Sequence, residues 1–203
     1  MSSALFIFDF DDTLAMTDSH VQVIDRYGRI TRLDSREFAA YRQLPGDTLD
    51  FSEFDRASGT LIENTVEAMQ DAISSHGIDN VYIVTARSIG TPVVAFLESF
   101  GLVSPNVVAT SGSEGKARWL ARTLASKKYT SVFVYEDCRK NITMLRDIVD
   151  AYNETISTPT STVNYKGICV LPGGRLVVAE SIVGNYVEKY MKLMCGIIPT
   201  ELN

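Results

Sequence analysis

The chain has 203 residues, of which 45% are hydrophobic and 22% charged, and it carries a formal net charge of −6 at pH 7. This composition is typical of a globular protein with one substantial core, and the length favours a single domain over residues 1–203. The negative charge argues against broad electrostatic binding to nucleic acid, and the lack of an apolar run of about 20 residues argues against a membrane span.

The first predicted elements are a strand, a hairpin and a short helix. Residues 4–8 form an apolar run that predicts a buried strand, and this run ends abruptly at the acidic stretch Asp9-Phe10-Asp11-Asp12. Residues 19–41 predict a β-hairpin that turns near Tyr27-Gly28. Its second half leads into a short helix, for which Asp34 and Glu37 have the spacing of a capping box.

Beyond a polar, Gly/Pro-containing loop at residues 43–59, helices and strands are predicted to alternate. The predicted helices are 61–77, 91–101, 115–127 and 139–153, and the predicted strands are 81–85, 106–110 and 131–137. Apolar strands that alternate with amphipathic helices predict a parallel sheet covered on both faces. The expected fold is therefore α/β, a Rossmann-like three-layer α/β/α sandwich. Residues 167–180 add a C-terminal β-hairpin, and residues 183–195 add a closing helix.

Polar side chains follow each predicted strand at the point where it ends. They are Asp9 and Asp11, then Thr85-Ala86-Arg87, then the stretch from Thr110 to Lys116, and then Glu136-Asp137. In open parallel sheets, ligands bind beyond the carboxyl ends of the strands, so these groups are expected to face one site. Crowded carboxylates are tolerable around a hard cation such as Mg²⁺, and Lys116 and Thr85 suit a phosphoryl group held beside it. The pattern therefore predicts a magnesium-assisted phosphoryl site.

These motifs resemble those of the haloacid dehalogenase (HAD) superfamily of phosphatases. The family pattern has DxDx[TV] after the first strand, a Thr or Ser after the second, then a Lys, and then an acidic motif. This chain has, in that order over residues 5–141, Asp9, Asp11 and Thr13, then Thr85, Lys116, and Glu136-Asp137 with Asn141. The DxDxT element is the most specific of these, and the ordered set strengthens it.

The resemblance implies how the carboxylates would act. Asp9 would attack phosphorus to give an aspartyl-phosphate, and Asp11 would protonate the leaving oxygen and later take a proton from water. Mg²⁺ would be bound by Asp9, by the backbone carbonyl of Asp11 and by an acidic residue of the last motif. We assign that last ligand to Asp137 and leave open whether Glu136 touches the metal instead.

The resemblance also implies a set of phosphate-binding residues. Thr85, Ala86 and Lys116 would hold phosphate oxygens, and Lys116 would in addition offset the charge on Asp9. Arg87 would either contact the substrate or pair with a nearby carboxylate. Asp12 is expected to cap a turn and to take no part in catalysis.

Members of the HAD superfamily differ chiefly in inserts that cover the nucleophile. Here the insert is expected at approximately residues 17–58, which is small, so we expect an open site for a bulky phosphoester such as a nucleic-acid end or a phosphoprotein. The stretch "DFDDTLA" followed by "VTAR" is similar to that of phage-type and polynucleotide 3′-phosphatase domains. A nucleotidase or a small-metabolite phosphatase of the same fold is the alternative within this class.

Two readings from other classes are also open. A phosphorylation-controlled receiver domain would use Asp55 as its phosphoacceptor, and a non-catalytic HAD-fold protein would only bind its ligand. The aromatic residues at 38, 41, 51 and 54 are expected to pack locally and not to form a base-stacking platform. Three cysteines without paired spacing favour reduced thiols in a cytoplasm, and we expect no signal peptide, no membrane contact and no obligate protein partner.

Overall fold

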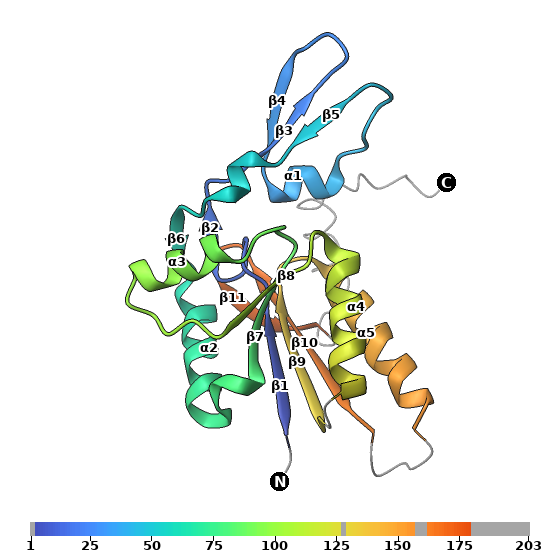
Figure 1. Ribbon diagram of the computed structural model, residues 1–203. Helices are drawn as coiled ribbons and strands as arrows, with labels where there is room; N and C mark the ends of the chain where they lie inside the picture. Colours follow the sequence, from blue (N-terminus) through green and yellow to red (C-terminus); the bar gives the residue numbers. More distant parts are fainter. Residues whose placement is uncertain (1–2, 127–128, 157–161, 180–203) are drawn as a thin grey trace, which may run out of the picture.

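A six-stranded β-sheet forms the centre of the computed structural model, which describes residues 3–126, 129–156 and 162–179 (Figure 1). Its strands in spatial order are β11 (Arg175–Val178), β10 (Asn164–Leu171), β9 (Ser131–Glu136), β1 (Ala4–Phe8), β7 (Val81–Thr85) and β8 (Asn106–Ala109). All neighbours in this sheet are parallel except β11, which pairs antiparallel with β10. The predicted α/β class with a mostly parallel sheet is confirmed.

Helices cover both faces of this sheet. They are α2 (Glu63–His76) and α3 (Thr91–Ser99) on one face, and α4 (Ser113–Ser126) and α5 (Arg139–Glu154) on the other. Phe8 of β1 lies in one apolar cluster with Met69 of α2, whereas Ile7 lies in a second cluster with Leu120 of α4. Because successive side chains of a strand point to opposite faces, the apolar run of β1 supplies both cores.

Between β1 and α2 the chain leaves the sheet and forms a small insert beyond its carboxyl edge (Figure 1). A two-stranded stem, β2 (Ala15–Thr17) and β6 (Gly59–Leu61), begins and ends it. The part between these strands, residues 18–58, holds β3 (Val21–Ile24), β4 (Ile30–Leu33), α1 (Ser35–Ala40), β5 (Thr48–Asp50) and the 3₁₀ turn η1 (Ser52–Asp55). Strands β4, β3 and β5 form a separate antiparallel sheet in that order. We refer to residues 15–61 as the insert.

The insert contains both predicted and unexpected elements. The hairpin of β3 and β4 turns through Gly28, whose φ of +79° favours glycine, and the capping box of Asp34 and Glu37 begins α1. The predicted loop at 43–59 was wrong in part, because β5, η1 and the start of β6 lie there. These short elements depend on partners far away in sequence, since β5 pairs with β3 and β6 with β2.

The C-terminal part also follows the prediction where it is described. β10 and β11 form the predicted hairpin, and the helix predicted at 183–195 lies outside the described residues. α2 begins at Glu63, so Leu61, the first residue of the helix predicted at 61–77, belongs to β6. Among the residues described, no helix has the length and apolar character needed to cross a lipid bilayer.

Candidate active site

Asp9 follows the last residue of β1 and lies at the carboxyl edge of the sheet. The backbone N–H of Asp9 donates to the carbonyl of Tyr135 at 3.0 Å, so the pairing of β1 with β9 continues past the end of β1. Phe10 is fully buried, and its carbonyl oxygen accepts three backbone N–H groups of the turn that follows. Asp12 lies in that turn with a φ of +57°, which Asp adopts more readily than most residues. The turn thus holds Asp9 and Asp11 on either side of an anchored aromatic residue.

Lys116 enters the same region from the first turn of α4. Its Nζ lies 2.8 Å from Oδ1 of Asp9 and 2.8 Å from Oε2 of Glu136, and its side chain is only 1% exposed. Gly115 permits this approach, because a Cβ there would overlap the carbonyl oxygen of Thr110. Burial alone would lower the pKa of Lys116, but the two carboxylates outweigh it and raise that pKa. Lys116 is therefore a fixed positive charge.

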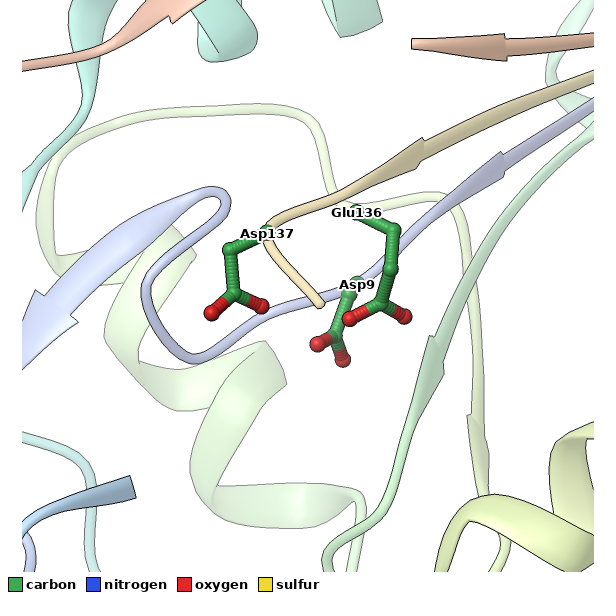
Figure 2. A group of neighbouring side chains, drawn as sticks. All are labelled: Asp9, Glu136 and Asp137. Atoms are coloured by element: carbon green, nitrogen blue, oxygen red, sulfur yellow. The ribbon is translucent and has the colours of Figure 1, made fainter. Parts of the chain in front are cut away.

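A third carboxylate, that of Asp137, lies beside the two that pair with this ammonium group. Asp9, Glu136 and Asp137 each offer an oxygen within 4.8 Å of the others, and their carboxyl groups lie together in Figure 2. Burial raises the pKa of all three carboxyl groups and is the largest cause in each case. For Asp137, burial together with the negative charges of Asp9 and Asp12 raises the pKa to about 7. Three carboxylates face one ammonium, which leaves an excess of two negative charges when all are ionised.

This cluster fits a small divalent cation by its chemistry. All of its donors are carboxylate oxygens, the type that hard cations such as Mg²⁺ prefer, and a charge of +2 would balance the excess. Glu136 is the least accessible of the three and already accepts from Lys116 and, at 3.3 Å, from the N–H of Cys138. Asp137 is less buried, and its own N–H donates to the Thr13 hydroxyl at 3.1 Å. This arrangement favours Asp9 and Asp137 over Glu136 as direct ligands.

Asp11 lies outside the carboxylate cluster and pairs with Arg87. Its two carboxylate oxygens accept from Nε of Arg87 at 2.9 Å and from Nη2 at 2.8 Å, and the hydroxyl of Thr17 donates to it at 2.6 Å. Of the two roles considered for Arg87, the structure shows the ion pair. The resemblance placed Asp11 at the metal only through its backbone carbonyl, and the Asp11 carboxylate is not part of the cluster of three.

Three further predicted residues lie around this edge. Thr85 is buried at the end of β7, and its hydroxyl accepts the N–H of Arg87 at 3.2 Å. The carbonyl of Ala86 accepts from Gly112 at 2.9 Å, which ties the β7 end to the loop before α4. Asn141 is buried in the first turn of α5, close in sequence to Asp137. Thr85 and Ala86 lie where β7 ends, and Asn141 lies in the helix that follows β9.

Other candidates have structural roles. Asp12 accepts a hydrogen bond from Ser35, the first residue of α1, and so joins the turn after β1 to the insert. Asp55 lies in η1 of the insert and not at the end of a sheet strand, which removes the basis of the receiver-domain reading. Phe38 packs edge-on against Phe51 with ring centroids 5.5 Å apart, as local packing predicts.

Sequence reasoning missed the groups of the insert that reach the site. Arg87 donates to the hydroxyl of Ser19 and to the carbonyls of Phe54 and Arg56. Asp11 accepts from the hydroxyl of Thr17. No motif spacing indicates such contacts, because two of the groups are backbone carbonyls and two are ordinary hydroxyls.

Comparison of the chain with models of known protein families, with curated protein sequences and with solved structures gives no match. The site must therefore be interpreted from its own geometry.

Proposed function

We propose that this protein is a Mg²⁺-dependent phosphomonoester hydrolase that acts through an aspartyl-phosphate, as the resemblance to the HAD superfamily implies. The observation that carries the proposal is the buried ammonium of Lys116 between Asp9 and Glu136, with Asp137 beside them, at the carboxyl edge of a parallel sheet. The excess negative charge of this cluster is costly to bury unless a cation balances it, and a bound cation together with Lys116 would attract an anionic ligand. Its composition suits a phosphoryl group better than an uncharged substrate.

Asp9 is the proposed nucleophile. One of its carboxylate oxygens forms a bond to phosphorus while the bond from phosphorus to the leaving oxygen breaks, which gives an acyl phosphate on Asp9. Lys116, 2.8 Å from Asp9, orients this carboxylate and offsets charge on the phosphoryl oxygens. Asp9 and Asp137 would hold Mg²⁺, which when bound supplies positive charge for those same oxygens.

Asp11 is the proposed proton carrier. In the first step it gives a proton to the leaving oxygen, and in the second it takes a proton from the water that attacks phosphorus. That attack breaks the bond between Asp9 and phosphorus and releases inorganic phosphate, so both aspartates return to their starting states. Asp11 lies outside the cluster of three carboxylates, which supports a role for it separate from the nucleophile and the proposed metal ligands. Its ion pair with Arg87 favours the carboxylate form, the form that takes a proton from water in the second step.

The proposed substrate is a bulky phosphoester, with nucleic-acid ends first among the candidates. The insert is a small three-stranded sheet with one six-residue helix, and it carries exposed apolar side chains such as Tyr27 and Phe51. A nucleotide or a small metabolite is the alternative substrate. Side-by-side hydrolysis of mononucleotides, sugar phosphates, 3′-phosphorylated oligonucleotides and phosphopeptides separates these classes.

Hydrolysis of p-nitrophenyl phosphate with and without Mg²⁺ tests the activity. We expect turnover that needs the metal and is abolished in Asp9→Asn, whereas Asp79→Asn, an exposed residue of the 3₁₀ turn η2 (Ile78–Asn80), retains it. An acid-quenched single turnover of radiolabelled substrate should leave label on the protein, and more of it in Asp11→Asn. Full activity in Asp9→Asn, or turnover in EDTA equal to that in Mg²⁺, would refute the mechanism, and a chain that binds phosphate without turnover would be the non-catalytic alternative.

A further inference from the structure

The guanidinium of Arg87 is buried and uses every one of its donors. Nε and Nη2 donate to Asp11 at 2.9 and 2.8 Å, and Nη2 also donates to the hydroxyl of Ser19 at 3.2 Å. Nη1 donates to the carbonyl of Phe54 at 2.9 Å and to that of Arg56 at 2.6 Å. These bonds account for the five N–H groups of an arginine side chain, which is 1% exposed here. Arg87 thus has no free donor for a substrate.

Two aromatic rings fix the plane of the same guanidinium. Its central carbon lies 5.2 Å from the ring centroid of Phe10, in the turn between the two catalytic aspartates, and 5.0 Å from that of Phe54, in η1 of the insert. Arginine stacks on aromatic faces in this way. Arg87 therefore contacts both the insert and the turn after β1, which holds Phe10 and Asp11, through hydrogen bonds and stacking.

The insert groups that contact Arg87 belong to one connected unit. The hydroxyl of Ser19 lies 3.4 Å from the carbonyl of Glu53 and donates to it. The carboxylate of Glu53 accepts from the N–H of His20 at 3.0 Å, from Gln22 at 3.0 Å and from Arg32 at 2.8 Å. These bonds join η1 to β3 and β4, so the segment that touches Arg87 moves with the insert sheet.

From these contacts we propose that Arg87 is a positioning residue that couples the placement of the insert to the orientation of Asp11. Three of its five bonds and one of its two rings come from the insert, and the other two bonds go to Asp11. Displacement of the insert would remove three of these bonds and one of the two rings and would expose that side of the guanidinium to water. Arg87 would then be free to turn, and Asp11 with it. Proton transfer is then complete only when the insert lies over the site. The inference rests on the proposed function, because it assigns Asp11 its role there.

The dependence of the rate on the leaving group tests the inference. An aryl phosphate such as p-nitrophenyl phosphate leaves with little need for a proton, whereas an alkyl phosphate such as glycerol phosphate needs one. Because both esters give the same acyl phosphate, the rate to compare is that of the first step, read as the single-turnover release of the alcohol or phenol. We expect Asp11→Asn to lower this rate by about 10²–10⁴-fold for the alkyl ester and far less for the aryl ester. Arg87→Met should show the same asymmetry with little change in KM, and it should add nothing in the Asp11→Asn background.

Arg87→Lys separates positioning from simple charge. Lysine keeps the charge but cannot make a paired, planar set of contacts, so we expect it not to rescue the alkyl ester. Arg26→Lys, an exposed arginine of the β3–β4 turn, is the matched control and should leave both rates unchanged. A rise in KM for both esters, rescued by lysine, would instead make Arg87 a substrate-binding residue and overturn the inference.

Substitutions of insert residues that contact Arg87 test the coupling from the insert. Ser19→Ala combined with Phe54→Leu removes contacts to Arg87 without touching Asp11, and it should lower the alkyl rate about tenfold more than the aryl rate. An equal loss on both esters, or no loss on either, contradicts the coupling. If the wild-type chain shows no turnover at all, or if Asp9→Asn remains active, the result refutes the proposed function and leaves the coupling through Arg87 unaffected.

Amide hydrogen exchange measures the coupling between Asp11 and the insert without an enzymatic assay. In Asp11→Asn we expect faster exchange of insert amides that are protected by the network, such as the N–H of His20, which donates to Glu53, and that of Asp18, which donates to Ser58. Amides of α4 should exchange at unchanged rates. Unchanged exchange across the insert would overturn the proposal whatever the enzymatic result.

Discussion

Replacing Lys116 by Met should strongly destabilise the protein when no divalent cation is present. Lys116 makes two ion pairs at 2.8 Å, and the side chains of Lys116 and Glu136 are 1% and 2% exposed. Removing one partner of a buried pair leaves the other charge unpaired, which costs about 3–5 kcal/mol. Since folded domains are stable by only about 5–15 kcal/mol, this loss is a large fraction of the total.

Urea unfolding in EDTA, followed by tryptophan fluorescence, measures this loss. The chain has a single tryptophan, Trp119, on the same helix as Lys116 and with its ring 5.1 Å from that of Tyr82 in β7, so its emission reports on the packed core. With a slope of about 2 kcal/mol per M, the midpoint should fall by about 2 M. Exposed Lys166→Met is the matched control and should change stability by less than about 0.5 kcal/mol.

A second variant tests the cause of the loss. Lys116→Met combined with Glu136→Gln removes one unpaired carboxylate together with its partner, so it should recover about half of the lost stability. Mg²⁺ should also stabilise Lys116→Met more than it stabilises the wild-type chain, because it would replace a missing positive charge. A loss below about 1 kcal/mol in EDTA for the single variant would refute the view that Lys116 compensates a buried acidic cluster.

Further predictions concern the insert, the first turn of α4 and the proposed metal site. Hydrogen bonds, above all the one from Arg32, lower the pKa of Glu53 to about 2, so the stability that Glu53 contributes is present above about pH 4.5 and is lost as the pH falls toward 2. The difference in unfolding free energy between wild type and Glu53→Gln, about 1 kcal/mol for this accessible group, should therefore shrink over that range in acid-urea titrations. A difference that stays constant with pH would contradict this prediction. Gly115→Ala should destabilise by about 1–3 kcal/mol in thermal unfolding, despite the better helix propensity of Ala, because its Cβ overlaps the carbonyl of Thr110; a gain in melting temperature would contradict it. Mg²⁺ at 100 times its Kd should stabilise the wild-type chain by about 2.7 kcal/mol in calorimetry and should barely affect Asp137→Asn. Equal stabilisation of the two proteins would show that Asp137 is not a metal ligand.

The central sheet could be predicted from sequence because its strands are buried on both faces. Residues 4–8 are apolar without interruption, and such runs followed by amphipathic helices are typical of a parallel sheet. The meeting of Asp9, Lys116 and Asp137 follows from the same rule, since parallel strands bring their carboxyl ends to one edge. Local chemistry likewise indicated the turn at Gly28 and the capping box at Asp34.

The arrangement of the insert could not be predicted in the same way. Strand β5 is three residues long, and only its pairing with β3 makes it a strand. The partners of Arg87 include the carbonyls of Phe54 and Arg56, which every residue possesses and which therefore leave no trace in the sequence. The sequence left two roles open for Arg87, and only the three-dimensional contacts distinguish them.

The position of β1 has a consequence for how the chain folds. β1 leaves the ribosome before either of its neighbours, yet it lies between them: Phe6 pairs with Val81 on one side and with Phe133 on the other. Until β9 has been synthesised, a five-residue apolar segment has one open edge, which is the kind of segment that aggregates or recruits a chaperone. Non-local pairing of this kind also slows folding. The central sheet is therefore expected to assemble late and cooperatively, after Glu136 has emerged.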